Sequence, residues 1–183
     1  MPENLPHRAP AATPMQATEW EGDFPARIRQ TFPALALSFK SYLGQNYIEA
    51  PAAAIADLLL YFRQHEAFDV LTDLTAVDYP TRPERFEIIY ILYSLERNER
   101  IRVKVHAALD HDVPTATAVY PAANWLEREV FDMFGIRFSG HPDLKRILLP
   151  EDWQGHPLRK ELSITAMDNE WVQRNLGIES GQS

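Results

Sequence analysis

Apolar residues recur along this chain with two different periods, and each period predicts one kind of secondary structure. Residues 33–42 and 47–50 are apolar stretches on either side of a turn near Gly44, which predicts a β-hairpin. Pro51 suits the first turn of a helix, and a helical spacing continues from it to about Gln64. The apolar face of this predicted helix consists of Ile55, Leu58, Leu59 and Phe62.

Three further stretches have the composition of strands. Residues 68–77 mix β-branched and apolar side chains and run into a turn at Asp78. Residues 86–95 are apolar on both alternating faces, which predicts a central strand covered on both sides. The polar loop 96–100 then leads into residues 101–107, which alternate cleanly and complete a second hairpin. The outward-facing residues of this last strand are Arg102, Lys104 and His106.

A second helix is indicated at both of its ends. Asn124 is a suitable N-cap, Glu127 stands three residues later as in a capping box, and Gly135 suits a left-handed C-terminal stop. Arg128 lies one turn from Asp132, which predicts an ion pair within the helix. The apolar face of this helix is formed by Leu126, Val130, Met133 and Phe134.

Prolines interrupt the remaining segments. A short helical segment is predicted from Pro114 until Pro121 ends it. Beyond Gly135 the chain has little periodicity, so we expect an extended arm there and no further sheet. The prolines of this arm are Pro142, Pro150 and Pro157.

The order of these elements predicts an α+β fold with two layers, in which a mixed or antiparallel sheet packs on helices. We expect a flexible N-terminal leader over residues 1–30, where the sequence is rich in proline and has no apolar run. A core domain is expected over residues 31–136. An extended partner-binding arm is expected over residues 137–183.

Composition narrows the range of functions. Hydrophobic residues make up 45% of the 183 positions, which is enough for a real core. Cysteine is absent, which excludes disulfides, thiolate catalysis, and iron–sulfur or zinc sites held by cysteine. A net charge of -8 argues against nucleic-acid binding by the whole surface. The longest uncharged apolar run, residues 50–56, is too short to cross a bilayer.

Positive charge is concentrated in one segment of this acidic chain. Residues 137–160 contain five basic and three acidic residues, a net charge of +2, so the remainder of the chain carries -10. A cationic segment stiffened by proline is typical of a part that lies along a partner protein. The basic residues are Arg137, Lys145, Arg146, Arg159 and Lys160.

Charged residues on the second predicted helix admit a chemical and a structural interpretation. Two carboxylates could act as acid and base, but no pocket that would shift their pKa values is visible in the sequence. We favour a cap, a dipole interaction and an intrahelical ion pair, and ion pairs to a neighbouring subunit are compatible with this. The residues concerned are Glu127, Arg128, Glu129 and Asp132.

The tripeptide Gly-His-Pro occurs twice, at residues 140–142 and 155–157, and basic residues follow each copy. Two histidines and two nearby carboxylates could bind Zn²⁺ or Fe²⁺, although the spacing is unusual for metal ligands. The structural alternative is that glycine allows a reversal, proline fixes the exit, and the cations address a carboxylate or a helix C-terminus. The residues of the metal hypothesis are His141, His156, Asp143 and Asp152.

Trp153 and Trp171 lie in the same aperiodic region. A tryptophan there either folds back onto the domain or is buried in another protein. We favour the partner, because aromatic residues and arginine are the usual interface anchors.

The segment EREVFDMFGIRFSGHPDLKRIL, residues 127–148, strongly resembles the signature of the thirty-kilodalton subunit family of respiratory complex I, the proton-pumping NADH:quinone oxidoreductase. The resemblance continues through LLPEDWQGHPLRK, residues 148–160, and FDVLTDLTAVDYP, residues 68–80, resembles an earlier block of the family. It covers about residues 34–160. Where the family commonly has Asp-Tyr-Pro after Leu-Arg-Lys, this chain has Glu161, Leu162 and Ser163.

The resemblance implies a non-catalytic subunit of the peripheral arm, on the cytoplasmic side of a bacterial inner membrane. It implies that this chain binds no cofactor, whereas FMN, Fe–S clusters and quinone belong to the complex. Its partners would be the other peripheral-arm subunits, chiefly the quinone-site subunit and the cluster-bearing subunits, with no nucleic acid and no direct membrane span. The expected partner interface consists of Glu127, Arg128, Glu129, Asp132, Arg137, His141, Lys145, Arg146, Trp153, His156, Arg159 and Lys160.

Other hypotheses remain open at this point. The equivalent subunit of a related membrane-bound hydrogenase, or of another quinone-reducing dehydrogenase, would carry the same motifs. A free-standing metal-dependent hydrolase would use the two histidines and two aspartates named above. A soluble binding module would act without companion subunits.

Overall fold

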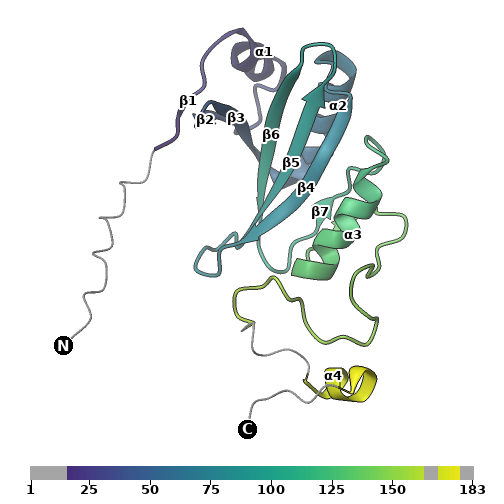
Figure 1. The fold of residues 1–183 in the computed structure, drawn as a ribbon. Helices are drawn as coiled ribbons and strands as arrows, with labels where there is room; N and C mark the ends of the chain where they lie inside the picture. The colour runs from purple at the N-terminus through teal and green to yellow at the C-terminus, as the bar shows by residue number, and fades with distance from the viewer. Residues whose placement is uncertain (1–15, 163–168, 178–183) are drawn as a thin grey trace, which may run out of the picture.

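A six-stranded sheet forms one layer of the protein in the computed structural model, which describes residues 16–162 and 169–177 (Figure 1). The strand order is β1-β2-β3-β6-β5-β4. Neighbouring strands are antiparallel except β3 and β6, which are parallel, so the sheet is mixed as expected. The strands are β1 (Thr18–Glu19), β2 (Ser38–Tyr42), β3 (Gln45–Pro51), β4 (Val70–Asp78), β5 (Phe86–Ser94) and β6 (Glu99–Ala107).

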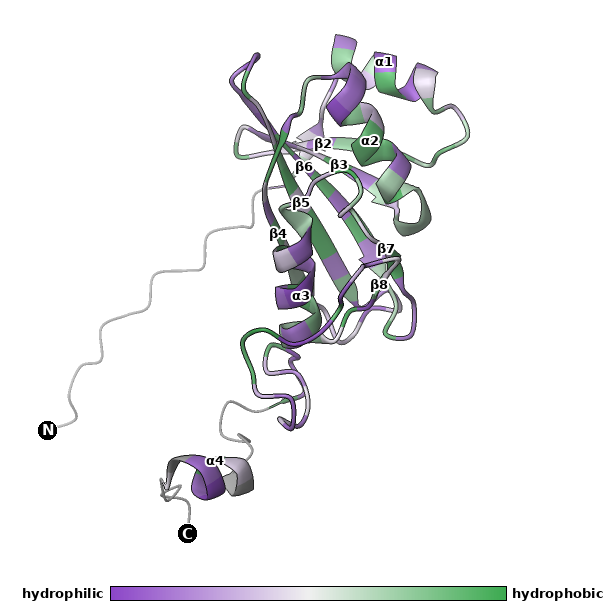
Figure 2. Ribbon diagram, turned by 90° about the vertical axis from the view of Figure 1, so that its right-hand side faces the viewer, coloured by the Kyte–Doolittle hydropathy of each residue, from purple (hydrophilic) through white to green (hydrophobic). Residues whose placement is uncertain are grey.

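Helices cover one face of this sheet and form the second layer (Figure 2). They are α1 (Asp23–Thr31), the short 3₁₀ turn η1 (Ala52–Ala54), α2 (Ile55–His65) and α3 (Ala123–Phe134). Helix α4 (Asn169–Leu176) follows the arm. A small second sheet joins β7 (Val113–Pro114) in parallel to β8 (Phe138–Ser139). None of the described helices is long and apolar enough to span a bilayer.

Helix α2 forms where the helical spacing predicted it, and it fills the centre of the core. Pro51 is extended at φ −61° and ψ 134°, and the chain turns into η1 and then α2. The four apolar residues of the predicted face, Ile55, Leu58, Leu59 and Phe62, are all fully buried. They pack in one cluster with the inward residues of the sheet. The opposite face of the sheet carries the ion pairs Lys40–Glu49 and Lys104–Glu87.

Both predicted hairpins are present. Strands β2 and β3 pair around a turn in which Leu43 and Gly44 have φ of 53° and 72°, a region that glycine adopts without steric cost. Strands β5 and β6 pair continuously, from Phe86 with Ala107 to Ser94 with Glu99. The predicted α+β fold with two layers is therefore confirmed.

The flexible leader predicted for residues 1–30 is wrong where the structure describes it, because β1 and most of α1 lie within that range. Phe24 packs its ring 5.9 Å from Phe62 and 6.1 Å from Phe68, and Ile28 is fully buried. Arg27 donates two hydrogen bonds of 2.8 Å to Glu66. The apolar residues Phe24, Ile28 and Phe32 recur at helical spacing, a short signal that our prediction passed over in favour of the proline content of residues 1–30. Residues 1–15 lie outside the described part.

Two predictions near the prolines are also wrong. Val113 and Pro114 form strand β7, and the residues up to Pro121 form turns in place of the short helix. The arm, for which we expected no further sheet, contributes strand β8, and the side chain of Phe138 in this strand is buried in the core. Local proline content gave no indication of this pairing, because the two strands are far apart in the sequence.

The core makes a direct prediction about stability. Leu59→Ala removes a fully buried side chain and leaves a cavity, so the free energy of unfolding of the full chain should fall by about 2–5 kcal/mol. Leu60→Ala is the matched control, because Leu60 is 40% exposed on the same helix and should cost less than about 1 kcal/mol. Urea unfolding followed by circular dichroism measures both, and equal losses would contradict the burial of this face of α2.

Candidate functional site

Helix α3 and the arm beside it bring together most of the residues that the sequence singled out. The helix begins at Ala123, and its N-cap residue, Ala122, makes no side-chain capping bond, so the predicted Asn124 cap is wrong. Its C-terminal stop is confirmed, because Gly135 adopts φ 73° and donates a 2.8 Å hydrogen bond to the Phe131 carbonyl.

Asp132 is the most heavily bonded carboxylate of this region, and it is fully buried. Its Oδ2 accepts hydrogen bonds from three consecutive backbone N–H groups, those of Ile147, Leu148 and Leu149, at 2.8 to 3.0 Å. Its Oδ1 accepts one from Arg146 Nη1 at 3.0 Å. Burial opposes ionisation of Asp132, but these donors outweigh it, so the pKa of its carboxyl lies below its usual range.

The ion pair predicted between Arg128 and Asp132 is therefore wrong, because Asp132 faces the arm. Arg128 donates from Nε to the Lys145 carbonyl at 3.2 Å. His141 reaches the Asn124 carbonyl with Nε2 at 3.1 Å. Helix residues 124, 128 and 132 follow one another at intervals of four, so they form one stripe of α3. The arm runs along this stripe from residue 141 to residue 149.

The last carbonyl groups of α3 are satisfied by the second Gly-His-Pro copy and the residues after it. His156 donates from Nδ1 to the Asp132 carbonyl at 2.9 Å, and Leu158 N–H donates to the Met133 carbonyl at 3.0 Å. Arg159 donates from Nε to the Phe134 carbonyl at 2.6 Å. These are groups that a helix end leaves without an internal partner. The interpretation that the arm cations address a carboxylate and a helix C-terminus is thus confirmed for Arg146 and Arg159.

Gly135 is required here for space as well as for its backbone conformation. A Cβ atom added to it would lie 2.5 Å from His156 Nε2, far inside contact distance. The close approach of His156 to the end of α3 therefore depends on this glycine.

The arm is also fastened to the end of the sheet. Asp78, the last residue of β4, accepts hydrogen bonds from Arg85 at 2.6 and 2.7 Å and from the Lys160 N–H at 2.7 Å. Arg85 forms a further ion pair with Glu161. The hydrogen bonds from Arg85 outweigh the effect of burial and hold the pKa of Asp78 below its usual range.

Both histidines of the metal hypothesis have structural partners. The backbone N–H of Asp143 donates to His141 Nδ1 at 3.0 Å, so both ring nitrogens of His141 are occupied. Within the part of the chain that the structure describes, no three histidine, aspartate or glutamate side chains are grouped to hold a metal ion. The geometry therefore does not bring the four proposed ligands together into one site.

Glu127 anchors a second segment to α3. It is fully buried, and its carboxylate accepts hydrogen bonds from Thr115 Oγ1 at 2.5 Å and from the Ala116 N–H at 2.6 Å. Burial raises the pKa of Glu127 to about 7, although both hydrogen bonds act in the opposite direction. The nearby Tyr90 hydroxyl is buried without a hydrogen-bond partner among the described residues. Glu127 thus serves the fold, and the predicted capping box is not formed.

The remaining residues of the predicted interface lie at the surface. Arg137 and Lys145 have side chains that are 73% and 57% exposed, and Glu129 and Lys160 are also exposed. Trp153 is half-buried, with its ring 5.4 Å from that of Trp171, which also donates to Asp152. The two tryptophans therefore pack on each other, an arrangement that the sequence did not suggest.

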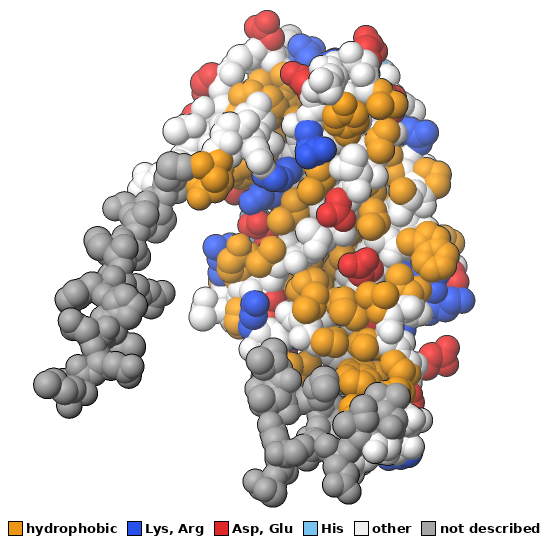
Figure 3. Space-filling model, viewed as in Figure 1, with side chains coloured by type: hydrophobic (Ala, Val, Ile, Leu, Met, Phe, Trp, Pro, Cys, Tyr) orange, Lys and Arg blue, Asp and Glu red, His pale blue; other side chains and the backbone are white. Residues whose placement is uncertain are grey.

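Apolar side chains also reach the surface along α3 and the arm (Figure 3). Trp125 is 64% exposed, Leu148 is 59% exposed and Leu158 is 49% exposed. None of these residues was among the candidates selected from the sequence. Trp125 falls outside the apolar face of its helix, and this was the one feature of the sequence that could have indicated an exposed tryptophan.

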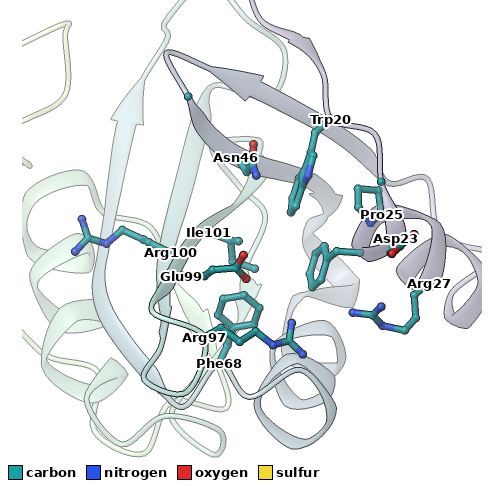
Figure 4. Close-up of a pocket in the computed structure, with 13 residues that line it drawn as sticks. Trp20, Asp23, Pro25, Arg27, Asn46, Phe68, Arg97, Glu99, Arg100 and Ile101 are labelled. Carbon is teal, nitrogen blue, oxygen red and sulfur yellow. The ribbon is translucent and has the colours of Figure 1, made fainter.

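A separate hollow of about 470 Å³ lies between α1 and the adjoining ends of β3 and β6 (Figure 4). Phe24 and Phe68 line it, and Arg27 and Arg97 stand over these two rings at 5.7 and 6.0 Å. Both guanidinium groups pair with the buried Glu66. Since the rings and cations already have partners inside the chain, we assign this hollow a structural origin.

The hydrogen bonds of Asp132 to residues 146–149 predict a measurable contribution to stability and to the ordering of the arm. Asp132→Asn removes the charge that faces Arg146 and one strong acceptor, so the free energy of unfolding should fall by about 3 kcal/mol. Hydrogen exchange of the Ile147, Leu148 and Leu149 amides should become faster. Glu129→Gln, an exposed position on the same helix, is the control and should change neither quantity. Unchanged exchange at the three amides in Asp132→Asn would show that Asp132 does not hold the arm.

Glu127 predicts a pH dependence of stability. Its folded pKa of about 7 lies above the ordinary 4.5, so the stability linked to this group is complete below pH 4.5 and is lost as the pH rises through 7. Glu127→Gln keeps an acceptor for the Ala116 N–H and cannot ionise. Between about pH 5.5 and about pH 8, wild type should lose about 2 kcal/mol more than this variant. Urea unfolding at both pH values tests this, and parallel losses would contradict it.

Comparison with known proteins points to one family. Residues 48–168 match the family described as respiratory-chain NADH dehydrogenase, 30 Kd subunit. An NADH-quinone oxidoreductase subunit of Parvibaculum lavamentivorans is 47% identical over 140 residues, which are 75% of this chain and 70% of the relative. The subunit of the same name from Rhodobacter capsulatus is 46% identical over 145 residues, 78% of this chain and 73% of the relative.

A solved structure is similar over most of the fold. A chain of the membrane-bound sulfane sulfur reductase, an archaeal respiratory membrane complex, is 25% identical with a TM-score of 0.67. The match covers 87% of this chain and 93% of that chain. These similarities confirm the resemblance inferred from residues 68–80 and 127–160. The chain belongs to the family of the 30 kDa subunit of respiratory-chain NADH dehydrogenase.

Proposed function

We propose that this chain is a non-catalytic structural subunit in the peripheral arm of an NADH:quinone oxidoreductase of the complex I type. The complex would pass electrons from NADH through FMN and Fe–S clusters to quinone, coupled to proton translocation. This chain would hold the quinone-reducing module together through contacts alone. The family membership and the names of the relatives support the complex.

The observation that carries the structural role is the way in which α3 and the arm use their polar groups. Asp132, Arg146, His156 and Arg159 bond within the chain. Such bonds fix the arm on the core without a partner, and its exposed groups are then presented at fixed positions. Preorganisation of this kind lowers the entropy cost of binding a partner.

The partners we propose are other peripheral-arm subunits, chiefly the quinone-site subunit and the cluster-bearing subunits. The complex would place this chain on the cytoplasmic side of the bacterial inner membrane, as a peripheral protein. FMN, Fe–S clusters and quinone would be bound by those partners. The absence of cysteine in this chain agrees with that division.

The proposed interface consists of those residues of the predicted set that are exposed, together with the half-buried Trp153. Arg137, Lys145 and Lys160 supply positive charge, and Glu129 and Trp153 complete the set. Because Glu127 and Asp132 are fully buried, we assign them to holding two segments on α3. The core predicted over residues 31–136 also includes Ile28 of α1 and Phe138 of β8. That the segment over residues 137–183 is a partner-binding arm remains our proposal, with the arm attached to α3 from residue 141 onward.

Charge reversal at two exposed arm positions tests this function. In a host that lacks its own copy, a tagged Arg137→Glu, Lys160→Glu double variant should recover roughly tenfold less of the cluster-bearing subunits from mild-detergent extracts, about 1.4 kcal/mol of binding. NADH:quinone reductase activity of the membranes should fall in parallel. Thermal unfolding of the purified variant should match wild type.

The matched control is Arg100→Glu with Arg102→Glu, which makes the same charge change on strand β6. This control should assemble normally. Wild type that purifies alone would contradict the proposed function, and so would equal losses in the two double variants.

A second candidate function has one observation in its favour. The similarity to a chain of the sulfane sulfur reductase, over 93% of that chain, also suits the equivalent subunit of another membrane-bound respiratory complex. The companion subunits that purify with the wild-type chain discriminate the two, because an NADH-oxidising flavoprotein belongs only to the first.

A further inference from the structure

One tryptophan on α3 is left uncovered by the described part of the chain. The Trp125 side chain is 64% exposed, and the only comparable exposure among the described aromatic residues is that of Tyr42 at 40%. The arm covers the neighbouring stripe of the helix, at residues 124, 128 and 132, through bonds to His141, Lys145 and residues 147–149. Trp125 therefore lies next to a part of the arm that these hydrogen bonds hold on the helix.

Arg128 places a positive charge beside the exposed Trp125 ring. Its guanidinium carbon lies 4.8 Å from the centre of the Trp125 ring, and its Nε donates to the Lys145 carbonyl at 3.2 Å. Arg128 as a whole is only 7% exposed. It forms no ion pair with a carboxylate among the described residues, and the nearby Asp143 pairs with the Lys145 ammonium group at 2.8 Å.

The guanidinium of Arg128 is largely buried, but no carboxylate forms an ion pair with it among the described residues. Removing the charge from water is costly, and a facing carboxylate recovers that loss with strong hydrogen bonds. A large aromatic side chain next to an arginine is also a frequent composition of an interface hot spot. The charge that Arg128 presents beside the indole is complementary to that of an acidic partner.

We infer that Trp125 is the anchor of a contact with another protein subunit, whose surface offers an apolar hollow for the indole beside a carboxylate for Arg128. The inference rests on the proposed function and adds to it one anchor on α3, separate from the exposed cations of the arm.

Site-specific cross-linking in the assembled complex tests the partner. A photoreactive phenylalanine analogue at position 125 of the full chain should form an adduct with one other subunit of the complex, within a segment that contains an aspartate or glutamate. The same analogue at Leu95, which is 68% exposed in the loop between β5 and β6, is the matched control and should not label that segment. Adducts from position 125 only with lipid, with a second copy or with nothing would overturn the inference.

Substitution measures the contribution of the anchor. Trp125→Ala should reduce recovery of the cross-linked subunit with the tagged chain about tenfold, Trp125→Phe should reduce it less, and Leu95→Ala should have no effect. Arg128→Lys should retain more recovery than Arg128→Gln, because it keeps the charge. The thermal midpoint of each purified chain shows whether folding is intact, and the cross-link decides the question for any variant that does not fold.

These outcomes separate the two proposals. If wild type recovers the other subunits and Trp125→Ala recovers them equally well, the anchor is wrong and the structural function stands. If wild type itself recovers none, the proposed function fails first.

Discussion

The C-terminal half of α3 sets the constraint on which the rest of this structure depends. A buried carboxylate and the last carbonyl groups of a helix must find hydrogen-bond partners, because leaving them unpaired away from water costs free energy. Asp132 takes its donors from residues 146–149, and the carbonyls of residues 132–134 take theirs from residues 156–159. These bonds fix the course of an arm that is aperiodic and mostly irregular.

The same device recurs at two other points. Glu127 receives the backbone of Ala116, and Asp78 receives the backbone of Lys160. In each case a buried acid on a regular element accepts an N–H from an irregular segment. Asp78, like Asp132, does so as a carboxylate whose pKa is lowered, whereas burial raises the pKa of Glu127 to about 7 and favours its neutral form. A backbone N–H is a suitable donor for attaching a loop, because ordering the backbone of the loop already fixes its position. A long cationic side chain would lose additional conformational entropy when it is ordered.

This arrangement suits a protein that works by contact. The charged groups that could have formed an acid–base site are used to hold segments in place, and the two histidines are bonded to the backbone of the same region. What reaches solvent is a mixture of exposed cations and apolar side chains, held on a rigid support. Arg128 is the exception, since it is largely buried and forms no ion pair among the described residues, while the nearby Asp143 pairs with Lys145.

The sequence by itself determined the elements whose periodicity reflects burial on one face: helix α2, both hairpins, the apolar face and glycine stop of α3, and so the α+β class. It also located the segment that carries the family's motifs, because Gly-His-Pro and the following cations are unusual as local chemistry. Only the tertiary structure decided the partners of Asp132, Glu127 and Arg128, since each lies far from its partner along the chain. The pairing of β7 with β8 was hidden for the same physical reason, because its hydrogen bonds join two distant segments of two residues each, which are too short to show a period. Helix α1 does show helical spacing at Phe24 and Ile28, but only its packing on Phe62 and Phe68 distinguishes so short an apolar face from a proline-rich leader.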